Sequence, residues 1–323
     1  MNQLKITFNG ALAFAVLAGM MTLVSANTAE AAIYVGNGHS ELADPQQAGT
    51  EAAAKAKAAL GDREAKVVLV FDSVGNGVPD KEAMLAGVTS VFDQSIVYGC
   101  SAYAPITQDC NTGTVGVLAL GGDIRAVAAV ADVEGGHEAC GKKIGEGLKA
   151  AGVPEGGGRV VLLFGACHVP TNDALVGGVC GVLGEKFPVA GGAAFRDLLY
   201  VQGKVLPKSN LGLMLCGDFK CGFAAKNAPA QEKERVIAVA GEAAEEALGE
   251  GKDKALLVLA FDCGGRRGQM GGAIDKELQL MKDAAGDTPI FGFYGSGETG
   301  PKDNDSPPHG VGYHIVICAI LGQ

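Results

Sequence analysis

The stretch Val67-Val68-Leu69-Val70-Phe71-Asp72 recurs twice further along the chain, as Val160-Val161-Leu162-Leu163-Phe164-Gly165 and as Leu257-Val258-Leu259-Ala260-Phe261-Asp262. Each copy is followed by a Gly-rich bend, a helical stretch and a second apolar run that ends at a glycine: Val97-Tyr98-Gly99, Val189-Ala190-Gly191 and Ile290-Phe291-Gly292. A repeat of roughly 95 residues is a whole supersecondary unit. The sequence therefore predicts one assembly of three related α/β units.

The same order of elements can be traced in each unit. An opening strand is expected at 33–35, 127–133 and 222–225, and a first helix at 45–60, 137–150 and 231–248. After the buried strand come a second helix at 81–92, 174–183 and 270–285, the strand that ends in glycine, a longer loop, and a final strand at 114–120, 211–216 and 312–321. The predicted fold class is α/β, with three pseudo-repeated β-α-β-α-β-β units forming mixed β-sheets covered by helices.

Glycines and polar segments mark the ends of the predicted elements. Gly61, Gly152 and Gly249 are placed to end the first helix of each unit in the left-handed conformation. The turn Gly121-Gly122-Asp123 leads into the second unit, so the boundaries run through predicted hairpins and the units are expected to share sheets. The longest polar loop, 300–310, is expected to be a flexible lid or rim.

The composition excludes several classes of protein. The 323 residues are 48% hydrophobic and 19% charged, which is too apolar for a disordered chain and ample for a large core. The net charge is −10, so neither a nucleic acid nor an anionic lipid surface is expected as a partner. The chain has no tryptophan and few aromatic residues, which argues against a platform for stacking bases or sugars.

The first 31 residues have the layout of a secretory signal peptide. A weakly basic start precedes an apolar run at 11–24 and the small-x-small site Ala29-Glu30-Ala31, which predicts cleavage after Ala31. The run is short for a membrane span, and no later segment reaches membrane length. We therefore expect an exported protein, periplasmic or extracellular, with no stable membrane insertion after cleavage. An uncleaved N-terminal anchor is the alternative.

Nine cysteines are an odd number for an exported chain of this length. Most of them sit among Gly, Ala, Val or Leu, where small buried thiols belong. The best candidate for a disulfide is Cys216 with Cys221, because a hairpin around the four intervening residues would place them opposite each other. Two packed thiols are the alternative at this position.

Two nucleotide-binding motifs are approached but not completed. Residues 295–300 match the dinucleotide fingerprint, but the Pro- and Asp-rich segment after them cannot form the helix that would face a pyrophosphate. Residues 136–143 are one residue short of a phosphate-binding loop, and Lys143 stands where a magnesium-binding hydroxyl is needed. No cofactor is therefore expected. The five histidines show no paired spacing and the cysteines form no Cys-x-x-Cys, so no metal site is expected either.

Polar side chains follow the strands of the first and third units, whereas the second unit has small apolar residues at the same places. Ligands of α/β sheets bind beyond the carboxyl ends of the strands. The third unit also supplies an arginine and a glutamate after these strands, a pair that suits a small zwitterion if Arg266 takes its carboxylate and Glu298 its ammonium group. The alternative is a surface arginine and a loop glutamate that never meet. The predicted ligand-binding residues are Asp72, Ser73, Cys100, Ser101, Asp262, Cys263, Arg266, Tyr294 and Glu298.

The third unit resembles the C-terminal half of a FIST domain, through Phe261-Asp262-Cys263-Gly264-Gly265-Arg266, a Glu/Leu-rich helix, and residues 289–298. Three further segments resemble the N-terminal half of that domain: the Ala-rich helix, residues 67–72 and Tyr98-Gly99-Cys100-Ser101. The resemblance covers residues 33–321 and implies a FIST N-type region at 32–225, with two units, and a FIST C-type region at 226–323, the third unit. It also implies a sensory domain that binds a small ligand, with amino acids as suggested ligands.

The chain departs from the family in two ways. After the polar loop it has His309-Gly310-Val311-Gly312-Tyr313-His314, where such domains often have a strand with Asn and Thr, so a contact that reads the ligand is altered or missing. The sequence shows no kinase, cyclase or chemotaxis module, so a signal is expected to pass to a separate partner.

Three functions of different class are consistent with these features. The first is an extracytoplasmic module that binds a small, amino-acid-like molecule. The second is a cysteine-dependent enzyme using Cys100 or Cys263, because nearby glycine amides would lower a thiol pKa and stabilise an oxyanion. The sequence places no histidine as a partner base and shows no complete catalytic signature, so we do not expect the protein to be an enzyme. A purely structural surface or interaction protein is the third.

Overall fold

The computed structural model describes residues 33–152, 157–168 and 170–323. The expected signal segment, 1–31, lies outside the described residues, and its cleavage stays a prediction.

The first repeat comprises β1 (Ile33–Ser40), α1 (Pro45–Leu60), β2 (Ala65–Asp72), α2 (Val78–Thr89), β3 (Val97–Ser101), β4 (Ala104–Thr107) and β5 (Val115–Gly122). The second comprises β6 (Ile124–Asp132), α3 (His137–Ala150), β7 (Gly158–Gly165), α4 (Thr171–Leu183), β8 (Val189–Ala193), β9 (Leu198–Val201), β10 (Lys204–Pro207) and β11 (Ser209–Gly217). The third comprises β12 (Phe219–Lys226), α5 (Lys233–Leu248), β13 (Ala255–Cys263), α6 (Gly264–Met270), α7 (Ile274–Ala285), β14 (Ile290–Gly295), β15 (Glu298–Pro301), β16 (Pro308–Val311) and β17 (Ile315–Gly322).

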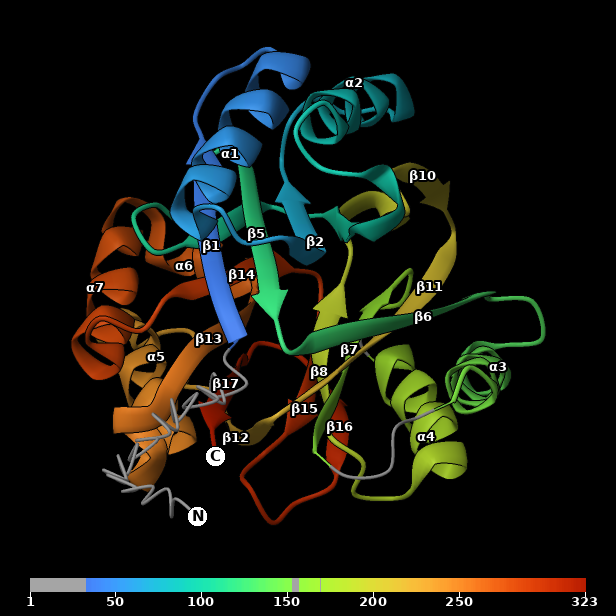
Figure 1. The fold of residues 1–323 in the computed structure, drawn as a ribbon. Coiled ribbons are helices and arrows are strands. Elements are labelled where there is room, and N and C mark those ends of the chain that lie inside the picture. Colours follow the sequence, from blue (N-terminus) through green and yellow to red (C-terminus); the bar gives the residue numbers. More distant parts are fainter. Residues whose placement is uncertain (1–32, 153–156, 169) are drawn as a thin grey trace, which may run out of the picture. The chain divides into compact units, whose positions relative to one another are not determined.

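The three repeats build the same four-stranded core. Its order is first, last, second and third strand of the repeat: β1-β5-β2-β3, β6-β11-β7-β8 and β12-β17-β13-β14. The second and third strands pair in parallel in every repeat, and the other pairs are antiparallel. Each sheet carries its own helices, α1 with α2, α3 with α4, and α5 with α6 and α7 (Figure 1). The predicted fold class, mixed sheets covered by helices in three repeats, is confirmed.

The segments expected to be loops after the third strands are strands that join another repeat's sheet. β4 pairs with β14, β9 with β3, and β15 with β8, so every repeat lends a strand to a different repeat. The exchange satisfies the backbone groups at the open edge of each third strand, which would otherwise lack hydrogen-bond partners. The polar segment 300–310, expected to be a lid, runs from the end of β15 into β16, and these two strands pair as a hairpin.

The predicted hairpins at the unit boundaries are wrong, although the sharing of sheets is right. β5 and β6 belong to different sheets, as do β11 and β12, because the first strand of each repeat pairs with the last strand of the same repeat. The short turns at the boundaries therefore pass the chain from one sheet to the next. Cys216 and Cys221 lie on strands of two different sheets, and all nine cysteines are free thiols. The predicted disulfide is absent for this reason.

The shared phenylalanines meet in one central core. Phe71, Phe164 and Phe261 are buried, and the ring centroids of Phe71 and Phe164 lie 5.4 Å apart, those of Phe164 and Phe261 6.3 Å apart. Phe293 packs against all three. The inner faces of the three sheets contribute to this core, while the outer faces pack against the helices of their own repeats. Strands buried on both faces explain the uninterrupted apolar runs.

The glycine at the end of the second apolar run permits close pairing of the parallel strands. A Cβ at Gly99, Gly191 or Gly292 would lie 1.9, 2.1 or 1.7 Å from a carbonyl oxygen of the neighbouring strand, so no other residue fits without displacing the backbone. The glycines at the helix ends, Gly61 and Gly249, have the predicted positive φ of 69° and 46°, but their ψ values of −142° and −137° are not left-handed helical. Among the helices of the described residues, none is both long and apolar enough to cross a membrane.

Candidate functional site

The carboxyl edge of the third-repeat sheet holds a cluster of buried ionic side chains. Asp262 is the residue before the last of β13 and faces Tyr294 in register across the parallel pair with β14. Arg266, on α6, is fully buried; its Nε donates to Asp262 Oδ1 and its Nη2 to Glu277 Oε1, each at 2.6 Å. Tyr294 donates from its hydroxyl to Glu277 Oε2 at 2.8 Å, and Asn111 donates from Nδ2 to the Tyr294 oxygen at 3.2 Å. We call these five residues with Glu298 the third-repeat cluster.

The third-repeat cluster contains three carboxyl groups and one guanidinium. Burial raises the pKa of Glu277 well above its ordinary value, and the neighbouring carboxylate of Asp262 raises it further. Burial likewise raises the pKa of Glu298, although the His314 N–H, which donates to Oε2 at 3.1 Å, opposes the shift. Burial by itself would lower the pKa of Arg266, but the carboxylates of Asp262 and Glu277 raise it overall. The arginine is thus permanently charged, and the surplus carboxyls favour their protonated forms.

Several buried polar atoms here have no hydrogen-bond partner among the described residues. They are Asp262 Oδ2, Arg266 Nη1, Glu298 Oε1 and, at the margin, Asn111 Oδ1, Arg267 Nε and the Tyr313 hydroxyl. Buried polar groups are nearly always paired, so a concentration of unpaired donors and acceptors in one place indicates a site that binds something polar. Arg266 is near enough to Glu298 for its charge to lower the pKa of that carboxyl, but Nε and Nη2 of the guanidinium already bond the protein. Ligand binding by this pair stays a prediction.

Two tyrosine rings lie against the glycine pair at the start of α6, Gly264 and Gly265. A Cβ at Gly264 would lie 2.4 Å from the ring of Tyr103, and one at Gly265 would lie 3.3 Å from the ring of Tyr313. Tyr103 is 41% exposed, and it reaches this place because β4 of the first repeat pairs with β14. Tyr313 has a φ of +59°, an uncommon conformation for a residue with a side chain. A side chain at Gly264 would collide with the Tyr103 ring, so the absence of one allows this contact.

The first repeat has a corresponding but complete arrangement. Asp72, which ends β2, is buried; its Oδ1 accepts from Lys81 Nζ and from the Val74 N–H at 3.1 Å, and its Oδ2 accepts from the Tyr200 hydroxyl. Lys81 Nζ also donates to the Val74 carbonyl at 2.6 Å. Burial raises the pKa of Asp72, while Lys81 opposes the shift. Both carboxylate oxygens are satisfied, which is the pattern of a structural clamp.

The remaining first-repeat residues of the predicted site are engaged in the framework. Ser73 donates from its hydroxyl to the Gly113 carbonyl at 3.4 Å, and Ser101 donates to the carbonyls of Phe195 and Leu198. Cys100 is fully buried in the central core. Among the described residues, no hydrogen bond or ion pair joins the predicted residues of the first repeat to those of the third. The nine predicted residues thus form two separate groups.

The two cysteines considered as nucleophiles differ in access but share a raised pKa. Burial raises the pKa of Cys100 well above its ordinary value. Cys263 is half-buried, and burial together with the Glu298 carboxylate raises its pKa to about 11. The backbone amides of Gly265, Arg266 and Tyr313 face the Cys263 sulfur, as expected, but their effect is smaller. At neutral pH both thiols are therefore protonated and poorly nucleophilic.

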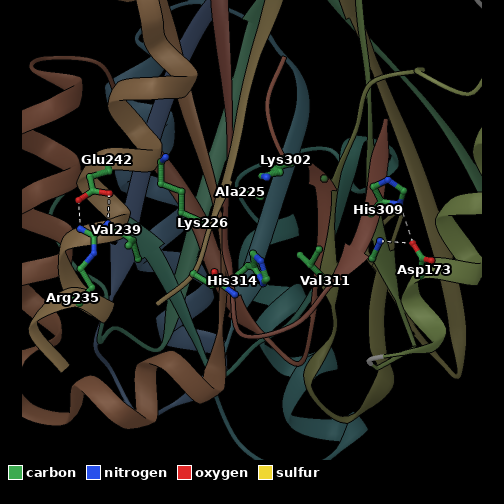
Figure 2. Close-up of a pocket in the computed structure, with 13 residues that line it drawn as sticks. Asp173, Ala225, Lys226, Arg235, Val239, Glu242, Lys302, His309, Val311 and His314 are labelled. Carbon is green, nitrogen blue, oxygen red and sulfur yellow. Dashed lines mark hydrogen bonds and ion pairs between the residues drawn. The ribbon is translucent and has the colours of Figure 1, made fainter. Parts of the chain in front are cut away.

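A cavity of about 620 Å³ lies next to the third-repeat cluster, at the same edge of the sheet. Figure 2 shows its two walls, α5 with Arg235 and Glu242 on one side and the β15–β16 hairpin with Lys302 and His309 on the other. None of the nine predicted residues lines this cavity. His314 joins the two features, because it lines the cavity while its backbone N–H donates to Glu298 and its carbonyl accepts from the Cys263 N–H at 3.1 Å.

The cavity carries charges of both signs. Arg235 and Glu242 form an ion pair along α5 through two hydrogen bonds. Asp173, at the start of α4, has its Oδ1 3.4 Å from His309 Nδ1, and the same oxygen accepts from the Gly310 N–H at 3.0 Å. Lys302 is exposed, and no carboxylate among the described residues lies within ion-pair distance of its Nζ. The cavity lining thus offers a cation, Lys302 after β15, and an anion, Asp173 on α4.

The residues missed by the sequence analysis carry a recognisable signal. Lys81 and Glu277 are charged, yet they lie on the buried face of their helices together with apolar residues three, four or seven positions away. Asn172 has the same kind of position on α4 and donates to the carbonyls of Glu298 and Val311. A charged or amide side chain on an apolar helix face therefore indicates a partner at a strand end. Tyr200 gave no such signal, because its contact depends on the strand exchange.

Two family models match the chain. The FIST N domain matches residues 66–242, and the FIST C domain matches residues 225–301. The chain belongs to the FIST family. FIST domains are sensory, ligand-binding domains, and the third-repeat cluster of this FIST protein lies within the FIST C match apart from Asn111. The resemblance drawn from the strand-end motifs is confirmed.

Two solved structures are similar to the chain at a low level. A cyanuric acid hydrolase from A. caulinodans has 12% identity and a TM-score of 0.46, and the alignment covers 90% of this chain and 99% of that chain. A second cyanuric acid hydrolase, described as an evolutionary innovation by structural concatenation, has 11% identity and a TM-score of 0.41, with coverage of 89% and 99%. Similarity at this level says nothing about the activity of the FIST protein. No curated protein sequence matches the chain significantly.

Proposed function

We propose that this FIST protein is an extracytoplasmic sensor that binds a small, amino-acid-like molecule in the cavity beside the third-repeat cluster. The observation that carries the proposal is a cavity of about 620 Å³, with charges of both signs, at the carboxyl edge of a sheet. Its volume lies within the range of small-molecule sites, about 300–1,000 Å³. Lys302 receives the carboxylate of the ligand, and Asp173 receives its ammonium group.

The third-repeat cluster responds to the ligand through His314. The side chain of His314 lines the cavity, and its backbone bonds Glu298 and Cys263. Burial lowers the pKa of His314, so the ring is neutral at neutral pH and adds no charge to the cavity. Arg266 and Glu298 act as positioning residues in this proposal, since neither lines the cavity.

The binding proposal is tested by calorimetry on the mature chain against a panel of amino acids and related metabolites. Lys302→Ala and Asp173→Asn should each weaken binding by about tenfold or more, or roughly 1.4 kcal/mol, because each removes one end of the zwitterion's contacts. Lys66→Ala is the matched control, since Lys66 is also a surface lysine but pairs with Glu64 outside the cavity. Binding that is equal in all four proteins would place the ligand elsewhere.

Export is tested separately, on protein purified from its own host. A mature chain that begins at Ala32, recovered from the periplasmic or extracellular fraction, supports the proposed location. Native mass spectrometry of the same sample shows whether a small molecule co-purifies. A full-length chain in the cytosolic fraction would contradict export without affecting the binding proposal.

The cysteine-dependent enzyme is not favoured by any contact at the strand ends. The raised pKa of Cys100 and the value of about 11 for Cys263 oppose the thiolate that such chemistry needs. His314, the histidine next to Cys263 in space, contributes its backbone to that neighbourhood, and its ring Nδ1 lies 2.7 Å from the Gly312 carbonyl. The ligand-binding function is therefore the conclusion.

A further inference from the structure

Three side chains of metal-binding type converge at the end of β1, away from the cavity. His39 is the residue before the last of β1, and Glu41 is the first residue after this strand. Cys110 lies in the loop between β4 and β5. The candidate ligand atoms of the three lie within 4.8 Å of one another. Glu41 and Cys110 are 69 residues apart in the chain, so no sequence spacing could have shown this group.

The geometry is close to that of a tetrahedral site. Zinc–ligand bonds of about 2.0–2.3 Å place neighbouring ligand atoms roughly 3.3–3.8 Å apart. Cys110 Sγ lies 3.5 Å from Glu41 Oε1 and 3.6 Å from the Thr112 hydroxyl, already within this range. The His39 ring nitrogen lies within 4.8 Å of both other ligand atoms. Cys110 is buried, His39 half-buried and Glu41 exposed, which leaves a path for an ion to enter from the Glu41 side.

The backbone holds the two segments together without help from these side chains. Thr114 donates from its hydroxyl to the carbonyls of Ser40 and Leu42, at 3.1 and 2.9 Å, and from its N–H to Ser40 at 2.8 Å. The Cys110 N–H donates to the Thr107 hydroxyl at 3.2 Å, and the Thr107 N–H donates to the Cys110 carbonyl at 2.8 Å. The ligand atoms are thus carried on a preformed scaffold, so little ordering is required when an ion binds.

We infer that His39, Glu41 and Cys110 bind one divalent transition-metal ion of the zinc type. Imidazole, carboxylate and thiolate together suit Zn²⁺ or Co²⁺, whereas Mg²⁺ and Ca²⁺ prefer oxygen ligands alone. Cys110 binds as the thiolate, and its proton passes to solvent as the sulfur–metal bond forms. Three protein ligands leave the fourth position to water or another small ligand.

A metal ion here would fasten the loop that contacts the third-repeat cluster. Asn111, next to Cys110, donates to the Ile274 carbonyl at 2.9 Å and to the Tyr294 hydroxyl at 3.2 Å. The ion would fix Cys110 against β1 and so restrain Asn111 where it meets Tyr294. The metal site therefore links the first repeat to the third-repeat cluster, independently of what the cavity binds.

The test is a cobalt titration of untagged protein that has been stripped of metal by a chelator. Cobalt bound by a thiolate gives a sulfur-to-cobalt charge-transfer band in the near ultraviolet, and a four-coordinate ion gives intense visible bands. We expect both to saturate at one equivalent and to be abolished by excess Zn²⁺. Cys110→Ser should remove the charge-transfer band, and His39→Ala should weaken the binding by at least about tenfold.

The controls are Cys180→Ser and His137→Ala, which replace a buried thiol and a half-buried imidazole outside the group. Both should leave the cobalt spectrum unchanged. Because Cys110→Ser removes a buried residue, its fold is checked by circular dichroism, and Glu41→Gln offers a second variant at an exposed position. Zn²⁺ should raise the Tm of the native protein and of both controls but not of Cys110→Ser. A missing charge-transfer band, or one that survives in Cys110→Ser, would overturn the assignment.

Discussion

The first and third repeats place buried ionic groups at corresponding strand ends, yet only one of the two arrangements is complete. In the first repeat, both oxygens of Asp72 accept hydrogen bonds, from Lys81, Tyr200 and a backbone N–H. In the third repeat, Asp262 and Arg266 each keep a buried polar atom with no partner among the described residues. The same strand arrangement thus carries a fully hydrogen-bonded carboxylate in the first repeat and a cluster with unpaired polar atoms in the third. The cluster with unpaired atoms is the one that adjoins the cavity.

The two repeats also differ in charge balance. Asp72 faces one cation, Lys81, so the pair is neutral as it stands. In the third repeat Arg266 forms ion pairs with Asp262 and Glu277. The charges of Asp262 and Arg266 also shift the pKa of the nearby Glu298, in opposite directions. Surplus buried carboxyls must take up protons or meet a further positive group. The third repeat is therefore the one whose protonation can respond to its surroundings.

Removing the cation from each repeat is the strongest test of this difference. Arg266→Met should lower the free energy of unfolding by about 3–5 kcal/mol, because buried carboxylates lose their partner. Lys81→Met should cost less, since it leaves a single carboxylate that still has the hydroxyl of Tyr200. Urea unfolding at neutral pH measures both. Glu277→Gln, added to Arg266→Met, should restore part of the loss; a larger cost at Lys81 than at Arg266 would contradict the comparison.

The sequence predicted the parts of the fold that depend on local pattern. The strands around Phe71, Phe164 and Phe261 were predictable because strands buried on both faces must be apolar throughout, and the first helices because of their Ala-rich composition. The strand exchange was not predictable from these signals, because each exchanged strand is short and its pairing depends on an edge that belongs to another repeat. The hairpins expected at the boundaries are absent for another reason, the pairing of the first with the last strand of the same repeat.

The candidate site was predictable only in part. Asp262 and Tyr294 lie near the ends of the paired strands β13 and β14, and Arg266 on α6 bonds Asp262. Glu298 lies near them on β15, a strand of the second-repeat sheet, and ligand binding by these residues stays a prediction. The sequence could not show that the first-repeat residues form a separate group, since three similar strand ends do not reveal which of them adjoin. The cavity was missed because Lys302 and Asp173 come from different repeats, and only the pairing of β15 with β8 brings their elements together.

The pH dependence of stability sharpens the comparison of charge balance. An acid whose pKa is higher in the folded than in the unfolded chain stabilises the fold below its unfolded pKa, and this contribution is lost as the pH rises through the folded pKa. Burial places Glu298 in this class, facing Asp262 and Cys263 of β13, Arg266 of α6 and the His314 N–H. Glu298→Gln should therefore become more stable relative to the native protein as the pH rises above 4.5, by at most about 1.4 kcal/mol per pH unit.

The matched control for this experiment is Glu51→Gln. A hydrogen bond from Ser40 lowers the pKa of Glu51, so its contribution has the opposite sign: it is present above the ordinary value of 4.5 and lost as the pH falls through the folded pKa. Thermal or urea unfolding at several values between about pH 5 and 8 should show a difference that changes with pH for Glu298→Gln and a constant one for Glu51→Gln, which titrates below 4.5. A stability difference for Glu298→Gln that does not change with pH would mean that Glu298 is ionised throughout and already neutralised by its neighbours.

The smallest effect concerns the two strand-end cysteines, Cys100 in the first repeat and Cys263 in the third. Cys263 is half-buried with a pKa of about 11, so iodoacetamide should label it slowly at neutral pH and about tenfold faster for each unit by which the pH is raised. Cys100 is fully buried and should react only after unfolding. Mass spectrometry of timed samples, with the half-buried Cys221 as an internal reference, measures both rates. Rapid labelling of Cys100 in the folded chain would show that the first-repeat edge opens as readily as the third, and the distinction between a closed clamp and an open cluster would fail.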